Sequence, residues 1–268
     1  MNSRLQTAAR AARAAGKILR AKFDATREIT SKGKRDIVTD ADFAADRAIR
    51  DILLGRFPQD RILSEEGDAA AWQALWAETE TNDDLAVWIV DPLDGTTNYA
   101  RHHSIFCVSI ALYQKRSVQA GVIYDCIHNE LFVAERGRGA TLNGKPIVAT
   151  TTRILDDAVV GLEWGRAQSA RRRTSELLAK LATRVMTVRS SGSAALSLCY
   201  VAAGRLDGYF HLSLAPWDVA AGALIAEEAG GCVTDPSGAP WTVHSKAYVA
   251  TNGPLHPTVL KFFKRRRL

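Results

Sequence analysis

The stretch from Trp88 to Ala100, WIVDPLDGTTNYA, places two carboxylates at the end of an apolar run. Asp91 and Asp94 lie three residues apart across a proline, and a glycine and two threonines follow directly. An unpaired charge is costly beside a buried strand, so the pattern predicts that a cation meets both carboxylates. A D-x-x-D spacing alone is more typical of a turn or a surface ion pair. The prediction therefore depends on the apolar lead-in and the Gly-Thr-Thr continuation.

The residues after Asp94 are those of a turn that binds an anion. Gly95 permits close approach of the backbone to a ligand. Thr96 and Thr97 stand where a helix is expected to begin, and free amide groups at a helix start favour phosphate. Hard oxygen ligands beside such an anion are the arrangement in which Mg²⁺ bridges to a phosphate. The sequence therefore predicts a magnesium and phosphate site at the end of this strand.

The composition is typical of a soluble globular protein, with 268 residues, 47% hydrophobic and 24% charged. No apolar run reaches the roughly 18 to 20 residues that span a bilayer, so no membrane association is expected. The N-terminal segment is rich in Arg and Ala. The helical spacing of its apolar side chains favours an amphipathic helix over a transit peptide.

The cysteines occur without a CxxC pair, each in an apolar stretch. Buried, reduced thiols are therefore expected, which favours a cytoplasmic location and disfavours a zinc site. The four positions are Cys107, Cys126, Cys199 and Cys232.

The net charge is +6 and the isoelectric point about 9.2. Basic clusters occur at Arg171–Arg173 and Lys264–Arg267. Such a balance is compatible with nucleic acid or with small anionic substrates as partners. No aromatic residues interleave with the clusters as a base-stacking platform requires, so a solvated face and a solvated tail are the favoured interpretation.

The order of predicted elements is not a regular β-α-β alternation. Helices are expected at about 3–24, 37–57, 170–183, 194–204 and 217–231. Strands are expected within 61–67, 87–91, 104–114, 118–127, 130–137, 157–164, 185–191, 206–212, 232–235 and 248–252, with a hairpin at 141–147 around Asn143-Gly144. Residues 69–84 are interpreted as a polar-faced excursion or lid. The pattern predicts an α/β (α+β) layered sandwich with two lobes, 1–150 and 151–268.

Three further acidic sites follow or open predicted elements. Glu65 and Glu66 come after the apolar segment RIL, Asp218 opens the helix after Trp217, and Asp40 and Asp42 lie in DIVTDAD. A solvated turn explains the first as well as a metal does. Helix capping explains the others, and for Asp218 taken alone it is the favoured interpretation.

Taken together, these motifs resemble the inositol monophosphatase family of Mg²⁺-dependent, lithium-sensitive phosphatases. The family signature W-x-[hydrophobic]-D-P-[hydrophobic]-D-G-T-x-N matches from Trp88 to Asn98. The elements D-x-V-T-x-x-D, E-E-x, W-D-x-A-A-G and E-A-G-G match at 36–42, 65–66, 217–222 and 228–231, in the family's order. The resemblance implies an alternating α-β-α-β-α sandwich of the inositol monophosphatase and fructose bisphosphatase type, usually a homodimer.

The resemblance also implies roles for particular residues. Two to three Mg²⁺ would be held by Glu65, Asp91, Asp94, Asp218 and the carbonyl of Leu93. Asp42 would hold the third, weaker ion through water and pair with Thr96. Thr96 and Glu65 would orient the attacking water, and Gly95 and Thr96 would donate backbone N–H groups to the phosphate. Gly192, Ser193 and Ala194 would line the leaving-group side together with Asp94.

One position departs from the pattern of typical inositol-preferring members. They have a glutamate seven residues before the Trp-Asp aspartate, where this sequence has His211. A histidine donates as well as accepts hydrogen bonds, and one that merely faces a polar rim of the strand explains the residue equally well. His102 and His103 show no metal-ligand spacing to the acids, and a substrate-rim or loop role is preferred for them.

The expected function is Mg²⁺-dependent hydrolysis of a small phosphate monoester by metal-activated water. Inositol monophosphate or a related sugar phosphate is the expected substrate. Fructose bisphosphate and histidinol phosphate are the alternatives within this chemistry, and His211 does not choose between them. A non-enzymatic alternative is binding to RNA or to the transcription machinery, because some bacterial members of the family associate with both.

Overall fold

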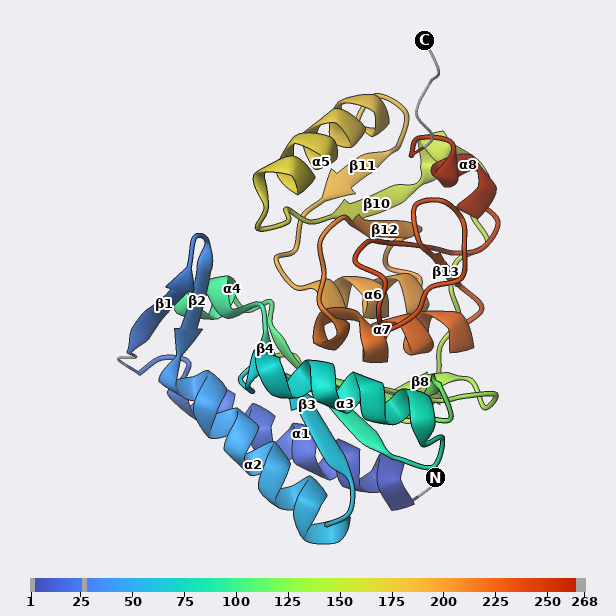
Figure 1. Cartoon of the computed structure of the whole chain (residues 1–268). Helices are drawn as coiled ribbons and strands as arrows, with labels where there is room; N and C mark the ends of the chain where they lie inside the picture. The colour runs from blue at the N-terminus through green and yellow to red at the C-terminus, as the bar shows by residue number, and fades with distance from the viewer. Residues whose placement is uncertain (1–2, 26–27, 264–268) are drawn as a thin grey trace.

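Helices and sheets alternate through the molecule in the order α-β-α-β-α (Figure 1). The computed structural model describes residues 3–25 and 28–263. Four apolar clusters fill the spaces between successive layers. The predicted layered α/β sandwich is therefore confirmed. Residues 147–154 connect the two large sheets without regular structure, and the division into lobes at residue 150 stays a prediction.

The first large sheet has seven strands in chain order, and only its first pair is parallel. Val87 and Ile89 pack toward one helical layer, while Trp88 and Val90 pack toward the other. Both faces are covered at this strand, β4 (Val87–Asp94), which explains why its sequence is a continuous apolar run rather than an alternating one. The strands are β3 (Arg61–Ser64), β4 (Val87–Asp94), β5 (Cys107–Gln114), β6 (Ser117–Asp125), β7 (Glu130–Glu135), β8 (Ala140–Leu142) and β9 (Lys145–Pro146).

Helices α1 (Ser3–Lys22) and α2 (Asp40–Arg56) cover the outer face of this sheet. The second helix begins at Asp40 and not at residue 37, because residues 36–39 instead form a strand. That strand, β2 (Asp36–Thr39), pairs with β1 (Ile29–Gly33) as an antiparallel hairpin. The hairpin was not predicted, since every residue of β1 is exposed and its sequence ITSKG has no apolar alternation.

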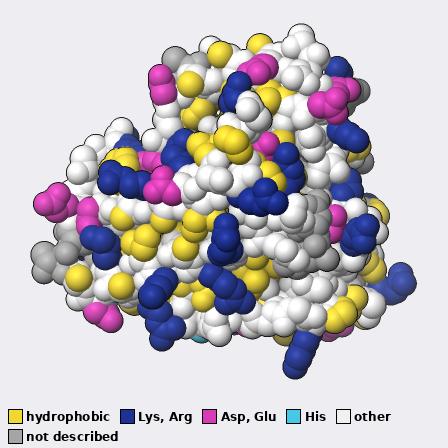
Figure 2. All heavy atoms as spheres, turned by 90° about the horizontal axis from the view of Figure 1, so that it is seen from below, with side chains coloured by type: hydrophobic (Ala, Val, Ile, Leu, Met, Phe, Trp, Pro, Cys, Tyr) yellow, Lys and Arg dark blue, Asp and Glu magenta, His cyan; other side chains and the backbone are white. Residues whose placement is uncertain are grey.

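Basic side chains gather on the outer face formed by α1 and α2, around a few hydrophobic ones (Figure 2). On α1 they recur every three or four residues, which places them on one side of the helix, and α1 contains no acidic residue. The exposed members are Arg10, Arg13, Lys17 and Arg20. The net positive charge is thus concentrated partly on this face.

The middle layer consists of α6 (Ala194–Ala202) and α7 (Pro216–Glu228), which lie between the two large sheets. Both helices are buried on nearly every side, so small residues are needed where they approach their neighbours. A Cβ on Gly222 would lie 2.7 Å from Leu198 Cβ, and one on Gly121 of β6 would lie 2.8 Å from the Ala221 carbonyl oxygen. The A-A-G run of α7 is explained by this packing.

The second large sheet has the order β11-β10-β12-β14-β13, with α5 and α8 on its outer face. The pairs β10–β11 and β10–β12 are parallel, and β14 is antiparallel to β12 and β13. Its elements are β10 (Val159–Leu162), α5 (Gln168–Leu181), β11 (Thr187–Arg189), β12 (Gly208–His211), β13 (Cys232–Thr234), β14 (Tyr248–Thr251) and α8 (His256–Leu260), preceded by a short 3-10 helix η1 (Leu155–Asp157).

The segment interpreted as a polar lid is a helix that packs on the core, α3 (Ala69–Thr81). Trp72 packs against Trp217 at a tilt, with 4.5 Å between ring centroids, and Trp76 contacts Tyr113 edge to face at 5.5 Å. The two tryptophans are four residues apart and therefore share one side of the helix. The interpretation as a polar excursion is wrong, because these rings outweigh the acidic residues that follow them.

The four cysteines are free thiols, of which Cys107, Cys126 and Cys199 are buried and Cys232 is half-buried. Among the described helices, none combines the length and the apolar character needed to cross a membrane. The basic cluster Lys264–Arg267 lies outside the described residues.

Candidate metal and phosphate site

Strand β4 ends in a bulge that turns both aspartates to the same face. Asp91 lies opposite Ser109 of β5 and Asp94 lies opposite Cys107, so β4 contains one extra residue between the two pairs. In a regular strand, residues three apart point to opposite faces, and the extra residue cancels that difference. The shared face is that of α6 and α7, since the Ser109 hydroxyl donates to the Trp217 carbonyl at 3.2 Å.

Three carboxylates converge beside this bulge. One oxygen each from Glu65, Asp91 and Asp218 lies within 4.8 Å of the others. Glu65 directly follows β3, and its N–H donates to the Val90 carbonyl at 3.1 Å. Because β3 and β4 are parallel, their carboxyl ends meet at one edge of the sheet. Asp218 reaches the same point from the first turn of α7, where it also accepts the N–H of Ala215 at 2.7 Å.

The cluster fits a hard divalent cation. Burial first, and then the charges of Glu65, Asp94 and Asp218, raise the pKa of Asp91 well above its usual range. Burial and the charges of Glu65 and Asp94 do the same to the pKa of Asp218. Among the ion pairs of the described residues, only that of Arg166 with Glu65 brings a positive charge to this cluster, so negative charge prevails where the three carboxylates meet. Carboxylate oxygens without sulfur or imidazole are the ligands that Mg²⁺ prefers.

Asp94 lies beside this cluster, with its carboxylate turned to the start of α6. It accepts the Ser193 hydroxyl, the N–H of Ala195 at 2.8 Å and the N–H of Ala194 at 3.4 Å. Burial raises the pKa of Asp94 to about 6, although the bonds from Ser193 and Ala195 lower it. The structure therefore joins Asp94 to the predicted leaving-group residues, and its part as a metal ligand stays a prediction.

The turn after β4 depends on glycine. Gly95 has φ of 96°, and a Cβ there would lie 2.9 Å from the Ile105 carbonyl oxygen. The short helix α4 (Thr96–Ala100) follows at once. The Thr96 hydroxyl donates to the Leu93 carbonyl at 3.0 Å and lies 3.4 Å from Asp42 Oδ1. The predicted residues from 93 to 96 thus form one connected turn.

The sequence allowed two roles for Asp42, capping of α2 or a role beside Thr96, and its two carboxylate oxygens divide between them. Its Oδ2 accepts the N–H of Thr39 at 2.8 Å and so caps the helix, while Oδ1 faces Thr96. Burial raises the pKa of Asp42 to about 7; the bonds from Thr39 oppose this shift, and the charges of Glu66 and Glu65 add to it.

The segment 190–194 is held beside Asp94 by two residues to which the sequence assigned no role. Glu163, just after β10, accepts the N–H groups of Ser191 at 2.6 Å and Gly192 at 2.7 Å. Asn98 Nδ2 donates to the Ser191 carbonyl at 2.8 Å. Asn98 is the last residue of the central signature, so the sequence did indicate that this position is functionally restricted. No pattern in the sequence distinguishes Glu163.

His211 lies on β12 and is 6% exposed. Its Nδ1 accepts the N–H of Ser213 at 3.0 Å, so the neutral ring carries its hydrogen on Nε2. Burial, and then the charge of Arg166, lower the pKa of His211 to about 4. His102 and His103 follow α4 and are absent from the acidic cluster found in the described part of the chain.

Two cations that the sequence did not single out border the acids. Arg166 Nη2 lies 3.4 Å from Glu65 Oε1 and 2.9 Å from Asp36 Oδ1. Lys32 Nζ of the β1–β2 hairpin lies 2.6 Å from Glu66 Oε1. Lys32 lies 34 residues from Glu66, and Arg166 lies 101 residues from Glu65, so no local pattern reveals either contact.

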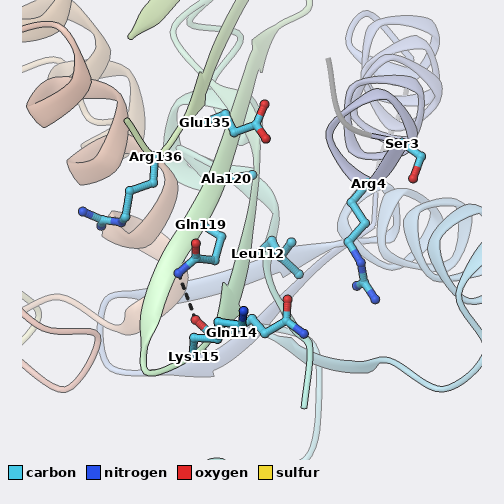
Figure 3. Close-up of a pocket in the computed structure, with 9 residues that line it drawn as sticks. All are labelled: Ser3, Arg4, Leu112, Gln114, Lys115, Gln119, Ala120, Glu135 and Arg136. Carbon is cyan, nitrogen blue, oxygen red and sulfur yellow. Dashed lines mark hydrogen bonds between the residues drawn. The ribbon is translucent and has the colours of Figure 1, made fainter. Parts of the chain in front are cut away.

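A separate pocket lies between the N-terminal end of α1 and strands β5 to β7 (Figure 3). Gln119 crosses its wall to donate to the Gln114 carbonyl at 3.0 Å. Its arginines are engaged in the fold, because Arg4 pairs with Asp60 and Arg136 Nε donates to the Val118 carbonyl at 2.7 Å. None of the predicted site residues lines this pocket, and we assign it no part in the chemistry.

Comparison with known proteins agrees with this geometry. The model of the inositol monophosphatase family matches residues 1–267. The chain is 40% identical over 241 residues to the Nus factor SuhB of Escherichia coli strain K12, covering 89% of this chain and 87% of that protein. It is 40% identical over 260 residues to inositol monophosphatase 3 of Solanum lycopersicum, covering 96% and 95%. A crystal structure of the extragenic suppressor protein suhB from Bartonella henselae has a TM-score of 0.90 and 33% identity, covering 99% of this chain and 100% of that one.

Proposed function

The chain belongs to the inositol monophosphatase family, and from that premise we propose that it hydrolyses a small phosphate monoester at a Mg²⁺ site built on Glu65, Asp91 and Asp218. Family membership supports phosphatase activity on phosphate monoesters. The observation that carries the proposal is the meeting of three carboxylates, from the ends of two parallel strands and the start of α7, within 4.8 Å. The Leu93 carbonyl and Asp94 are further ligands in this proposal, for two to three ions in all.

The chemistry needs charge compensation and an activated water. When bound, Mg²⁺ supplies positive charge for the phosphoryl oxygens and lowers the pKa of a coordinated water. Glu65 and Thr96 would orient the attacking water, with the Thr96 hydroxyl held by the Leu93 carbonyl and facing Asp42. The N–H groups of Gly95 and Thr96 would hold the phosphate at the turn into α4.

The residues on the leaving-group side belong to the same proposal. Gly192, Ser193 and Ala194 would contact the alcohol, because Glu163 holds this segment beside Asp94. His211 would contribute an N–H donor there. Inositol monophosphate or a related sugar phosphate is the proposed substrate, with fructose bisphosphate and histidinol phosphate as alternatives. Lithium inhibition and a homodimer stay predictions from the family resemblance, and a cytoplasmic location stays a prediction from the reduced cysteines.

A binding role is the second candidate, and it depends on a different part of the molecule. The basic side of α1, with Arg10, Arg13, Lys17 and Arg20, is an electrostatic footprint for an anionic polymer (Figure 2). One relative bears the name Nus factor. Such a function needs none of the acids at the end of β4, so it would survive their replacement.

Phosphate release over a panel of monoesters tests the first proposal and separates it from the second. The panel includes inositol 1-phosphate, fructose bisphosphate, histidinol phosphate and adenosine bisphosphate, each with Mg²⁺ and with chelator. Asp91→Asn serves as the blank. Release that requires Mg²⁺ and disappears in the variant is the expected result. Absence of Mg²⁺-dependent release from every member would contradict the proposed hydrolysis and favour the binding role.

A further inference from the structure

Arg166 occupies an unusual position between the acids and solvent. It lies in the loop between β10 and α5, and its side chain is 58% exposed. Only Nη2 meets the acids, at Glu65 and Asp36, and the Asp36 contact is an ion pair without hydrogen-bond alignment. Within the described residues, Nε and Nη1 of Arg166 make no hydrogen bond or ion pair. The guanidinium therefore retains free donors directly beside the candidate metal site.

Beyond Asp36 and Glu65, which Nη2 already meets, the neighbouring polar groups offer donors and few free acceptors. His211 uses Nδ1 as an acceptor for Ser213, which leaves Nε2–H as the free position of its neutral ring. The nearby carboxylate of Glu163 is taken up by Ser190, Ser191 and Gly192. A neutral polyol needs acceptors as well as donors for its hydroxyl groups, whereas an oxyanion only accepts. The free Nε and Nη1 edge of Arg166, turned from the acids that Nη2 meets, therefore suits an anion better than a sugar hydroxyl.

We propose that Arg166 selects phosphate monoesters whose alcohol carries a second anionic group, a phosphate or a carboxylate. This inference rests on the proposed function and goes beyond it in naming the class of substrate. A guanidinium binds a planar carboxylate or a phosphate through two parallel N–H bonds, which a lysine cannot reproduce. The second anion would meet the free edge of Arg166 while the scissile phosphate lies at the turn after β4.

A purely structural part for Arg166 has to be distinguished from this one. Arg35 of the β1–β2 hairpin donates to the Arg166 carbonyl at 3.2 Å, and Asp36 pairs with the side chain. Arg166 therefore also links the hairpin to the loop after β10. Loss of such a link would alter the turnover of all substrates alike, whereas loss of an anion contact would alter only those with the second charge.

Matched pairs of substrates test the proposal. One pair is inositol 1-phosphate and inositol 1,4-bisphosphate, and the other is glycerol 2-phosphate and 2-phosphoglycerate. The native protein should prefer the anionic member of at least one pair, and the pair with the larger preference identifies phosphate or carboxylate. Arg166→Gln should reduce that preference by about tenfold or more, because a charge-assisted hydrogen bond is lost. The loss should be in KM of the anionic member, with Arg166→Lys intermediate.

Two control variants isolate the guanidinium. Arg172→Gln removes the same charge from the exposed side of α5, away from the acids, and should leave the preference unchanged. Asp36→Asn breaks the link to the hairpin and keeps the guanidinium, so it should also retain the preference. If Asp36→Asn reproduces the effect of Arg166→Gln, or if Arg166→Gln slows both members equally, Arg166 is only a structural link.

Calorimetric titration with inositol 1,4-bisphosphate in the presence of Mg²⁺ measures binding without relying on hydrolysis. It therefore tests the anion contact of Arg166 separately from the proposed phosphatase activity. If no substrate is hydrolysed, the proposed function fails, yet binding that Arg166→Gln weakens about tenfold would still support the anion contact. Equal binding by the native protein and Arg166→Gln, or a native preference for the neutral members, overturns the inference.

Discussion

The base of the candidate site lies in the core, whereas its rim lies on the surface. At the base, Asp91 lies in a strand that is buried at every residue, and Asp218 lies in the first turn of a helix enclosed between two sheets. At the rim, β1 is exposed at every residue, and Lys32 and Arg166 reach the acids by ion pairs. Both regions face the same small volume but are positioned by different forces.

This difference separates chemistry from selectivity. Packing and backbone pairing fix the carboxylates, so they stay close together despite their mutual repulsion. Exposed ion pairs such as those of Arg166 contribute only about 0 to 1 kcal/mol, so this part of the rim can change its residues with little loss of stability, whereas the Lys32–Glu66 pair is more buried. We therefore expect changes at the base to remove turnover and changes at the rim to redirect it.

The largest effect is expected for Asp218→Asn. Removal of one of three converging carboxylates should lower turnover by about a thousandfold, the scale on which removal of one charge-stabilising group acts in enzymes. The same variant should lose the rise in melting temperature that Mg²⁺ gives the native protein. Phosphate release and thermal unfolding, each with and without Mg²⁺, measure the two effects.

Asp125→Asn is the matched control for that variant, because Asp125 is another aspartate that accepts backbone N–H groups. It is fully buried, whereas Asp218 is half-buried, and it lies at the end of β6, where it accepts the N–H groups of Ile127 and His128. It should retain Mg²⁺-dependent stabilisation whatever its own melting temperature. Equal loss of that stabilisation in both variants would place the metal response outside the three-acid cluster.

A smaller loss is expected for Glu163→Ala, which tests whether the base extends to the segment 190–194. Without this carboxylate, the N–H groups of Ser191 and Gly192 lose their acceptor and the segment beside Asp94 loosens. We expect kcat/KM to fall by about ten- to hundredfold, since bonds to a charged group contribute about 1.5 to 3 kcal/mol. Glu163→Gln, which keeps one acceptor oxygen, should recover part of the loss.

Glu228→Ala provides the comparison for this variant. Glu228 also accepts two backbone N–H groups, those of Gly137 at 2.7 Å and Gly139 at 2.8 Å, but far from the acids. Steady-state kinetics should show native turnover for Glu228→Ala. If Glu163→Ala also has the native kcat/KM, the segment 190–194 does not need the Glu163 carboxylate for catalysis.

The sequence predicted the base far better than the rim, for a physical reason. The run from Trp88 to Asn98 combines an apolar strand, a bulge residue and a left-handed glycine, and each is a local requirement that restricts residue type. Sequence patterns report such local requirements. The direction of the Asp94 carboxylate toward α6 was not predicted, because it depends on a helix a hundred residues away.

The contacts of the rim were not predicted, because no local pattern in the sequence indicates them. The hairpin β1–β2 buries too little to impose an alternation of apolar and polar residues. Arg166 lies in a loop between β10 and α5, and nothing in its neighbours indicates that it meets Glu65. The helix α3 was misjudged for a related reason: the acids that follow Trp72 and Trp76 suggested a polar face, while the rings decide the packing.

An effect of moderate size is expected from pH, and it concerns the boundary between base and rim. The folded-state pKa of Asp42, about 7, is above its ordinary value of 3.8. Protonation of Asp42 therefore favours the folded state, and this contribution is lost as pH rises from about 4 to about 7. In chelator, the native protein should lose melting temperature relative to Asp42→Asn across this range.

The difference in melting temperature between the native protein and Asp42→Asn is the quantity to follow. The contributions of groups that titrate in both proteins cancel in this difference. His211 is one of them, since its lowered pKa destabilises the fold as pH falls below about 6.5. Thermal unfolding at several pH values with chelator gives the measurement. A constant difference between native protein and Asp42→Asn would mean that Asp42 is charged throughout.

The smallest effect is expected for His211→Glu, which changes selectivity at the rim and leaves the base intact. A glutamate there adds an acceptor near Arg166, so the leaving-group side would suit a polyol better and an anion less well. We expect kcat/KM for inositol 1-phosphate relative to inositol 1,4-bisphosphate to rise about fivefold, the scale of about one hydrogen bond. His211→Gln, which adds an acceptor without charge, should shift the ratio less.

The ratio for the native protein, divided by that for His211→Gln, should also be constant between pH 5.5 and 8. A pKa of about 4 keeps His211 neutral throughout that range, and titration of the substrates' own phosphates is common to both proteins. A change near pH 6.5 in the native protein that His211→Gln does not share would show that the ring takes up a proton and acts as a cation toward the substrate. The rim would then contain two charges, Arg166 and His211, in place of one charge and one neutral donor. That outcome would strengthen the contrast with the acidic base but transfer part of the selectivity from Arg166 to His211.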